Sequence, residues 1–142
     1  MSMVFYLVKV TPAVAEKIRA EPDLLPQVWR EIELTDPDIA AISDSDRLME
    51  DYLHIGERFV DHPGRYPWME RALSGTGTQI AFEFGYGPGF FVTPDEAGKI
   101  ATGLAEEGSW KPGQPVEWVD DAIAAFYTTA HAEGKSIIGG VG

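Results

Sequence analysis

The sequence predicts an α+β domain in which a small mixed sheet packs against several amphipathic helices. Short runs of β-branched and aromatic residues, typical of strands, lie near both ends of the chain, at residues 4–10 and 136–141. Threonine–proline pairs mark the starts of two helices, each directly after a predicted strand. The predicted order is a strand, helices, strands, two helices and a strand, which is typical of the α+β class.

The first strand, VFYLVKV, covers residues 4–10. Thr11 is the expected cap of a helix that has Pro12 in its first turn and ends near Ala20. A similar junction occurs later: VTPAVAEKI begins at Val10, and VTPDEAGKI begins at Val92. Because the flanking residues do not continue the match, convergence on good capping chemistry is favoured, and duplication of a strand–helix unit is the alternative.

The segment YGPGFFVTPDEAGKIATGL, residues 86–104, gives the strongest local prediction. Alternating glycines at its start allow backbone conformations that a Cβ forbids, and the FFV run that follows is typical of a strand end. Thr93 is the expected helix cap, Pro94 fits the first turn, and Glu96 completes a capping box with Thr93. Apolar residues then repeat every three or four positions, and Gly108 lies where the helix should end.

Periodicity and turn residues define the remaining elements. From Asp46 onward, a long middle helix is predicted by apolar residues at helical spacing, namely Leu48, Tyr52, Ile55 and Phe59. The other predicted elements, in chain order, are a helix around 25–32, an acidic surface loop at 35–45, a helical turn at 68–73, a strand at 79–84, a loop at 110–115, a helix from 119 to about 134 and a strand at 136–141.

Length and composition are those of one soluble domain spanning residues 1–142. With 44% hydrophobic residues, a chain of this length can bury roughly two-thirds of its unfolded surface. Its apolar runs are much shorter than the roughly 20 residues of a membrane span, so no membrane location is expected. The absence of cysteine excludes disulfides and thiolate metal ligands, and a cytoplasmic location is expected.

The formal net charge is −12. A surface this negative repels phosphate backbones, so nucleic-acid binding is not expected. If the protein has a protein partner, the charge favours a basic one. The alternative is an acidic surface that only keeps the chain soluble. The oligomeric state and the identity of a partner do not follow from the sequence.

Three blocks of sequence carry a family resemblance: Tyr52–His54, ALSGTG at 72–77 together with the 86–104 segment, and AAFYTTAHAEGKSII at 124–138. On these blocks the chain resembles the YfbM-like family of bacterial domains of unknown function. The resemblance implies a small α+β fold, and it supplies no agreed catalytic residues. Relatives usually have a tryptophan four residues before the helix histidine, where this chain has Glu50, so a pocket that includes that tryptophan would be altered here.

His54 is the first candidate site residue, because a histidine at the edge of an apolar helix face can act as a base or a ligand. Its alternative role is structural, through a hydrogen bond to a neighbouring backbone or carboxylate group. A small polar ligand or partner site could include further candidates, namely Glu83, Tyr86, Tyr127 and His131. Tyr127 and His131 are four residues apart on one predicted helix and should share a face. Structural packing of these tyrosines is the alternative.

No cofactor and no metal site are expected. The histidines do not have metal-ligand spacing. Gly134-Lys135-Ser136 imitates the end of a phosphate loop, but Thr129 stands where that loop needs a glycine, and the segment runs from helix to strand. The glycines at 85, 87 and 89 do not have the spacing of a dinucleotide-binding motif.

The sequence favours a non-enzymatic binding or interaction protein, with a regulatory or immunity-like role as one version. This hypothesis rests on the strong negative charge and on the absence of a catalytic signature. The alternative is a small-molecule-binding enzyme or sensor with a polar pocket around His54 and His131. Convergence of the candidate side chains on one pocket would favour the alternative, whereas exposed aromatic residues, such as Trp68, Trp110 or Trp118, would favour protein binding.

Overall fold

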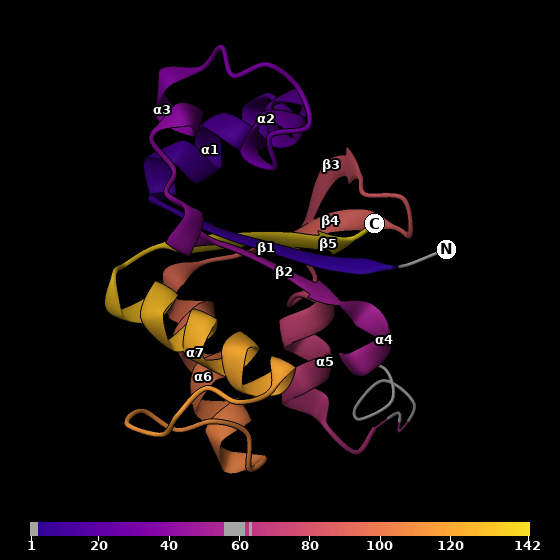
Figure 1. Cartoon of the computed structure of the whole chain (residues 1–142), viewed down its shortest axis with the longest axis vertical. Helices are drawn as coiled ribbons and strands as arrows, with labels where there is room; N and C mark the ends of the chain where they lie inside the picture. Colours follow the sequence, from indigo (N-terminus) through magenta and orange to yellow (C-terminus); the bar gives the residue numbers. More distant parts are fainter. Residues whose placement is uncertain (1–2, 56–61, 63) are drawn as a thin grey trace.

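A five-stranded sheet forms the middle of the molecule, with helices on both of its faces (Figure 1). The computed structural model describes residues 3–55, 62 and 64–142. The strands are β1 (Val4–Val10), β2 (Arg47–Asp51), β3 (Gln79–Glu83), β4 (Pro88–Val92) and β5 (Ser136–Val141). The α-helices are α1 (Pro12–Ala20), α2 (Leu25–Val28), α3 (Pro37–Ala40), α4 (Tyr52–Ile55), α5 (Pro67–Ser74), α6 (Pro94–Glu106) and α7 (Val119–Ala132), and short 3-10 turns cover Pro22–Leu24 and Asp44–Asp46. Of the helices in these residues, none has the length and apolar character that crossing a membrane requires.

The strands lie in the order β2-β1-β5-β4-β3, and every neighbouring pair is antiparallel. The predicted α+β class is confirmed, but the sheet in the described residues is antiparallel rather than mixed. The connections explain the difference. Between β4 and β5 the chain passes along the sheet face twice, in α6 and then in α7, so β5 runs back alongside β4.

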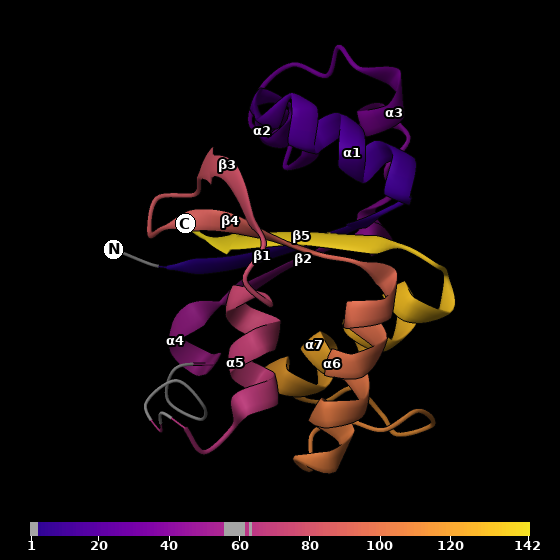
Figure 2. The ribbon, with the colours of Figure 1, turned by 180° about the vertical axis from the view of Figure 1, so that it is seen from behind.

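Alternate residues of the strands face the two helical layers. Helices α1–α3 cover one face of the sheet, where Val8 and Ile138 are buried with Ile18 of α1. Helices α4–α7 cover the other face, where Leu7 and Ile137 contribute to the larger core (Figure 2). The period-two pattern of the strands therefore builds two separate hydrophobic clusters.

Both predicted threonine caps are present. The Thr93 hydroxyl accepts a hydrogen bond from the Glu96 amide at 3.2 Å, and the Glu96 carboxylate accepts one from the Thr93 amide at 3.0 Å. Thr11 accepts a hydrogen bond from the Val14 amide at 3.3 Å at the start of α1. These bonds satisfy amides that lack partners in the first turn of a helix, and they confirm the predicted helix starts.

The predicted middle helix from Asp46 is wrong in its first part. Residues 47–51 form β2, which pairs with β1 from Val8–Arg47 to Val4–Asp51, and only then does the short helix α4 begin. Pairing with β1 satisfies backbone groups along both strands, and this tertiary interaction outweighs a helical spacing of apolar residues. Phe59, the last residue of the predicted apolar face, lies outside the described residues.

Two further elements near the N-terminus differ from the prediction. The helix predicted around 25–32 is reduced to α2, because Arg30 has a φ of 58°, which a right-handed helix does not permit. The acidic loop predicted at 35–45 contains the short helix α3. Asp36 caps α3 by accepting hydrogen bonds from the amides of Asp38 and Ile39.

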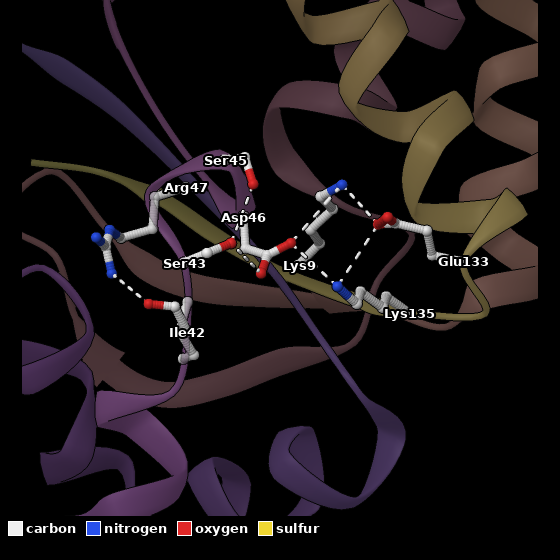
Figure 3. A network of polar contacts seen from close by, with 8 residues as sticks. All are labelled: Lys9, Ile42, Ser43, Ser45, Asp46, Arg47, Glu133 and Lys135. Carbon is white, nitrogen blue, oxygen red and sulfur yellow. Dashed lines mark hydrogen bonds and ion pairs between the residues drawn. The ribbon is translucent and has the colours of Figure 1, made fainter.

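A cluster of four charged side chains joins the sheet to the end of α7 (Figure 3). Lys9 of β1 is buried, and its ammonium lies 2.6 Å from Glu133 and 3.7 Å from Asp46. Lys135 lies 3.1 Å from Asp46 and 3.5 Å from Glu133. Each ammonium therefore faces two carboxylates, which compensates for the burial of Lys9.

Candidate functional site

His131 is held against the first turn of α6. Its Nδ1 lies 2.9 Å from the carbonyl oxygen of Pro94. A carbonyl only accepts hydrogen bonds, so Nδ1 carries the hydrogen, and Nε2 of the neutral ring keeps a free lone pair. A Cβ at Gly98 would lie 2.5 Å from Nδ1, so this position accommodates the ring only because it is glycine.

Two adjoining grooves run along the outer face of α6, and we call them the α6 grooves. The first has a volume of about 540 Å³ and is lined by Trp68, Asp95, Gly98, Lys99, Thr102, Gly103, Glu106 and His131. The second has a volume of about 390 Å³ and is lined by Gly98, Ala101, Thr102, Ala105, Glu106, Lys111, Pro112, Thr128 and His131. Both volumes fall within or near the usual size range of ligand sites.

Small residues of α6 line both grooves, together with the imidazole of His131, and the indole of Trp68 lines the first groove. Trp68 of α5 packs over Gly103 so closely that a Cβ at this glycine would overlap the indole. The guanidinium of Arg71 lies 4.3 Å from the centre of the same indole. Glu107 fixes α5 against α6, because its carboxylate accepts the amide hydrogens of Trp68 at 2.8 Å and Met69 at 3.2 Å.

The polar groups of the α6 grooves include side chains of both charges. Asp95 and Glu106 give negative charge, and Lys99 and Lys111 give positive charge. The hydroxyl of Thr102 donates to the Gly98 carbonyl at 3.0 Å, so it is not bonded to a base that could activate it. Among residues 3–55, 62 and 64–142, no group of three or more potential ligands could hold a metal ion.

Tyr127 has a structural role in the core. Its hydroxyl donates a hydrogen bond to the carbonyl oxygen of Ala72 at 2.6 Å, and its side chain is fully buried. Burial raises the pKa of Tyr127 far above its ordinary value, so the phenol stays neutral. Although Tyr127 and His131 are four residues apart on α7, the first is in the core and the second is exposed.

Glu83 and Tyr86 belong to the turn between β3 and β4. The Glu83 carboxylate accepts the amide hydrogens of Gly87 at 2.7 Å and Gly85 at 3.3 Å, which closes the turn. The side chain of Tyr86 is 47% exposed, and its backbone amide donates to the Val141 carbonyl at 3.0 Å. Glu83 therefore holds a turn together, whereas Tyr86 presents an aromatic surface.

His54 is exposed on α4, directly before the buried Ile55. The charge of His54 acts on Glu50, the last residue but one of β2. Burial raises the pKa of Glu50, and the positive charge of His54 opposes that rise. Neither of the α6 grooves is lined by His54, Glu83, Tyr86 or Tyr127, so the structure brings His131 to these grooves without the other four.

The sequence named Trp68, Trp110 and Trp118 as possible exposed aromatic residues, but only Trp118 is exposed, and Trp68 instead packs over Gly103. Sequence reasoning did not single out the two glycines of α6, Gly98 and Gly103, that receive the rings of His131 and Trp68. The sequence does mark these glycines as unusual, because Gly98 and Gly103 both lie inside a helix that is clearly predicted by its regular spacing of apolar residues. A glycine there costs about 1 kcal/mol relative to alanine, so a close approach by a neighbouring group is the usual reason for it. The identity of that group could not be read from the pattern.

Fold and grooves together define an α+β domain with an antiparallel sheet between two helical layers and an open surface along α6. A scan against models of protein families gives no match, and a search of curated proteins gives none. Among solved structures, the chain is similar to the crystal structure of YfbM from Escherichia coli, a protein of unknown function. The TM-score is 0.58 at 12% identity, over 96% of this chain and 98% of YfbM. The resemblance predicted from the sequence is confirmed at the level of the fold.

Proposed function

We propose that this chain is a non-enzymatic binding protein that receives a segment of a basic protein along the α6 grooves. The observation that carries the proposal is how three of the candidate site residues are used. Tyr127 and Glu83 are bonded to backbone groups, and His131 uses Nδ1 in the same way. The α6 grooves beside His131 remain open and offer both apolar and charged surface.

Exposed apolar residues near these grooves support a protein partner. Lys111 and Pro112, in the connection between α6 and α7, line the second groove. The same connection carries Val116, which is 54% exposed, and Trp118, which is 63% exposed. Large exposed aromatic residues are enriched at protein interfaces, because they bury much area with few rotatable bonds.

The charge of the molecule sets the chemistry of the partner. A net charge of −12 attracts a basic protein over long distances and accelerates its association at low ionic strength. Asp95 and Glu106 supply carboxylates within the first groove for lysine or arginine side chains of the partner. A regulatory or immunity-like role in the cytoplasm, in which this chain masks a basic protein, is consistent with that chemistry.

The experiment compares two tryptophan substitutions on the surface. Thr102 lines both grooves, so Thr102→Trp should fill them, whereas Ala13 is exposed on α1 in the other helical layer. A basic partner recovered with the wild-type chain at low salt is identified, purified and titrated against both variants. We expect Thr102→Trp to weaken binding by at least about tenfold and Ala13→Trp to leave it unchanged. Binding should also weaken as salt is added.

Three outcomes would contradict this proposal. The first is recovery of no partner at low salt in repeated experiments. The second is an acidic partner, or one whose affinity does not respond to salt. The third is equal binding by the Thr102→Trp variant and the wild-type chain, which would place the interface elsewhere on the molecule.

A small-molecule sensor is the second candidate function, and one observation favours it. Because Nδ1 of His131 donates to Pro94, Nε2 is available to accept a hydrogen bond from a ligand in the adjoining groove. A screen of metabolites by thermal unfolding tests this function, since a ligand of the native state raises the melting temperature. The sensor hypothesis requires a ligand whose stabilising effect is lost in His131→Gln and kept in the control His54→Gln.

A further inference from the structure

The sheet has two edge strands, β2 and β3, and they differ in shape. The pairing of β3 with β4 shifts in register between Ile80 and Glu83, and β3 curls away from the plane of the other strands (Figure 1). Bulges and twists of this kind protect an edge from pairing with another strand. β2 has no such irregularity: five consecutive residues pair with β1.

The hydrogen-bond pattern shows which residues of β2 face outward. Val4 and Gly142 exchange two backbone hydrogen bonds, at 2.7 and 2.9 Å, so the even-numbered residues of β1 bond to β5. The odd-numbered residues of β1 therefore bond to β2, as the 3.0 Å bond from the Tyr52 amide to the Met3 carbonyl confirms. Residues 50 and 48 pair with Phe5 and Leu7, so their backbone amide and carbonyl groups are directed toward β1.

Consequently Arg47, Met49 and Asp51 direct their backbone groups away from β1. The Arg47 amide is used, because it donates to the Asp44 carbonyl in the preceding turn. Outside the β1–β2 ladder, the described part of the chain provides no backbone partner for the Arg47 carbonyl, for the amide and carbonyl of Met49 or for the Asp51 amide. The Asp51 carbonyl belongs to the first turn of α4, and the Asp51 carboxylate accepts the Leu53 amide hydrogen at 2.9 Å. This outer edge of β2 can accept another strand.

We propose that β2 of a second copy of this chain pairs with β2 in antiparallel orientation, centred on Met49. Met49 then faces Met49 of the second copy, and Arg47 faces Asp51 at both ends of the pair. The two methionines exchange two backbone hydrogen bonds, and each Asp51 amide donates to an Arg47 carbonyl. The two sheets join into one continuous sheet.

Charge selects this register over its neighbours. A shift by two positions in one direction sets Glu50 directly opposite Glu50 of the second copy, and like charges in this position are destabilising. The opposite shift pairs only residues 47–49 and leaves Asp51 unused. The side chain of Arg47 is only 11% exposed, and its guanidinium already contacts Asp44 and the carbonyl oxygens of Val28 and Ile42. Repulsion between the Glu50 side chains in the shifted register, rather than an ion pair of Arg47 with Asp51, therefore favours this register.

The side chains of the edge are also suited to a second copy. Met49 is 54% exposed. It is the register partner of Tyr6 in the β1–β2 pair, so the two side chains lie on the same face of the sheet. The ring of Tyr6 lies 5.1 Å from that of Trp29 and 6.0 Å from that of Phe84, so Met49 extends an aromatic surface up to the edge. In the proposed dimer the two methionines cover each other, and these surfaces become continuous.

Cysteine crosslinking tests the proposal, since the wild-type chain has no cysteine. Directly opposite residues in a hydrogen-bonded antiparallel pair have Cα atoms about 5.5 Å apart, which a disulfide can span. Under mild oxidation, Met49→Cys should form a covalent dimer at least about tenfold faster than Leu48→Cys, which faces Glu50 in this register. Ala13→Cys, on the exposed surface of α1, gives the rate of crosslinking by random collision.

Molar mass by light scattering gives the second measurement. The wild-type chain should be a dimer, and Met49→Lys, which replaces an exposed side chain, should be a monomer with an unchanged circular dichroism spectrum. A monomeric wild-type chain at all concentrations up to about 1 mM, the affinity of a very weak complex, would overturn the proposal. Equal crosslinking by Leu48→Cys and Met49→Cys would overturn the register. The α6 grooves are not involved, so these results are independent of the basic partner.

Discussion

The ammonium of Lys9 lies 2.6 Å from the carboxylate of Glu133 and joins β1 to the end of α7 across 124 residues of sequence. The side chain of Lys9 is only 6% exposed, whereas that of Glu133 is 40% exposed. A buried ammonium is costly unless anions and hydrogen bonds compensate for lost water. Gly134, with a φ of 65°, ends α7, and the ion pair anchors that end to β1, two residues after His131.

Glu133→Gln should reduce the free energy of unfolding by about 1–2 kcal/mol, because it removes the nearest negative charge from a buried ammonium. The control is Glu16→Gln, which breaks an exposed ion pair with Arg19 on α1 and should cost about 0.5 kcal/mol or less. Urea unfolding at neutral pH measures both. Equal losses in the two variants would show that burial of Lys9 has no energetic consequence.

Acid should weaken the same cluster through Asp46. Burial acts to raise the pKa of Asp46, but hydrogen bonds from Lys135 and Ser43 outweigh it, and the pKa lies below its ordinary value. A carboxyl with a lowered pKa in the folded state contributes stability above its unfolded pKa of about 3.9. That contribution is lost as the pH falls through the folded pKa.

Asp46→Asn tests this pH dependence. The variant should unfold more easily than the wild-type chain at pH 7, and the difference should shrink as the pH falls below about 4. Urea unfolding over a series of pH values measures the difference. If it stays constant with pH, Asp46 contributes through packing or neutral hydrogen bonds and not through its charge.

The parts of the fold that depend on near neighbours in the sequence could be predicted. The capping box joins Thr93 to Glu96, three residues away, so both partners are visible in one short segment. β2 could not be predicted in this way, because its conformation depends on pairing with β1, about forty residues earlier. Its apolar residues fit a helical spacing equally well, and periodicity alone cannot choose between the two.

The candidate site could be predicted only in part, for the same reason. His131 is a functional residue type on a clear helix, and the sequence identifies it. The groove beside it depends on Trp68 of α5 packing over α6, and this contact is set by the tertiary structure. Tyr127 has the same residue type as a catalytic tyrosine, and only its buried bond to Ala72 shows that it is structural.

Tyr127→Phe should destabilise the fold and leave partner binding unchanged. Removal of the hydroxyl leaves the Ala72 carbonyl buried without its hydrogen bond, which costs about 1–2 kcal/mol. Tyr86→Phe, at an exposed position, should have almost no effect on urea unfolding. If Tyr127→Phe abolished binding at a temperature where the variant is fully folded, a structural role would not be sufficient.

Gly98→Ala tests whether the glycine is present to accommodate His131. In the wild-type chain a new methyl group would lie 2.5 Å from Nδ1, so the ring must move and lose its hydrogen bond to Pro94. We expect Gly98→Ala to lower the free energy of unfolding by about 1 kcal/mol in this background, despite the better helix propensity of alanine. The α6 grooves should change shape as the ring moves.

The same substitution should have the opposite effect when the imidazole is absent. In a His131→Ala background the methyl group meets no ring, and Gly98→Ala should raise the free energy of unfolding by about 1 kcal/mol through helix propensity alone. Urea unfolding of the four chains gives the coupling energy between the two positions. A coupling near zero would mean that the ring can move away without cost. In that case Nδ1 does not hold His131 in place, and the orientation of Nε2 in the groove is not fixed by Pro94.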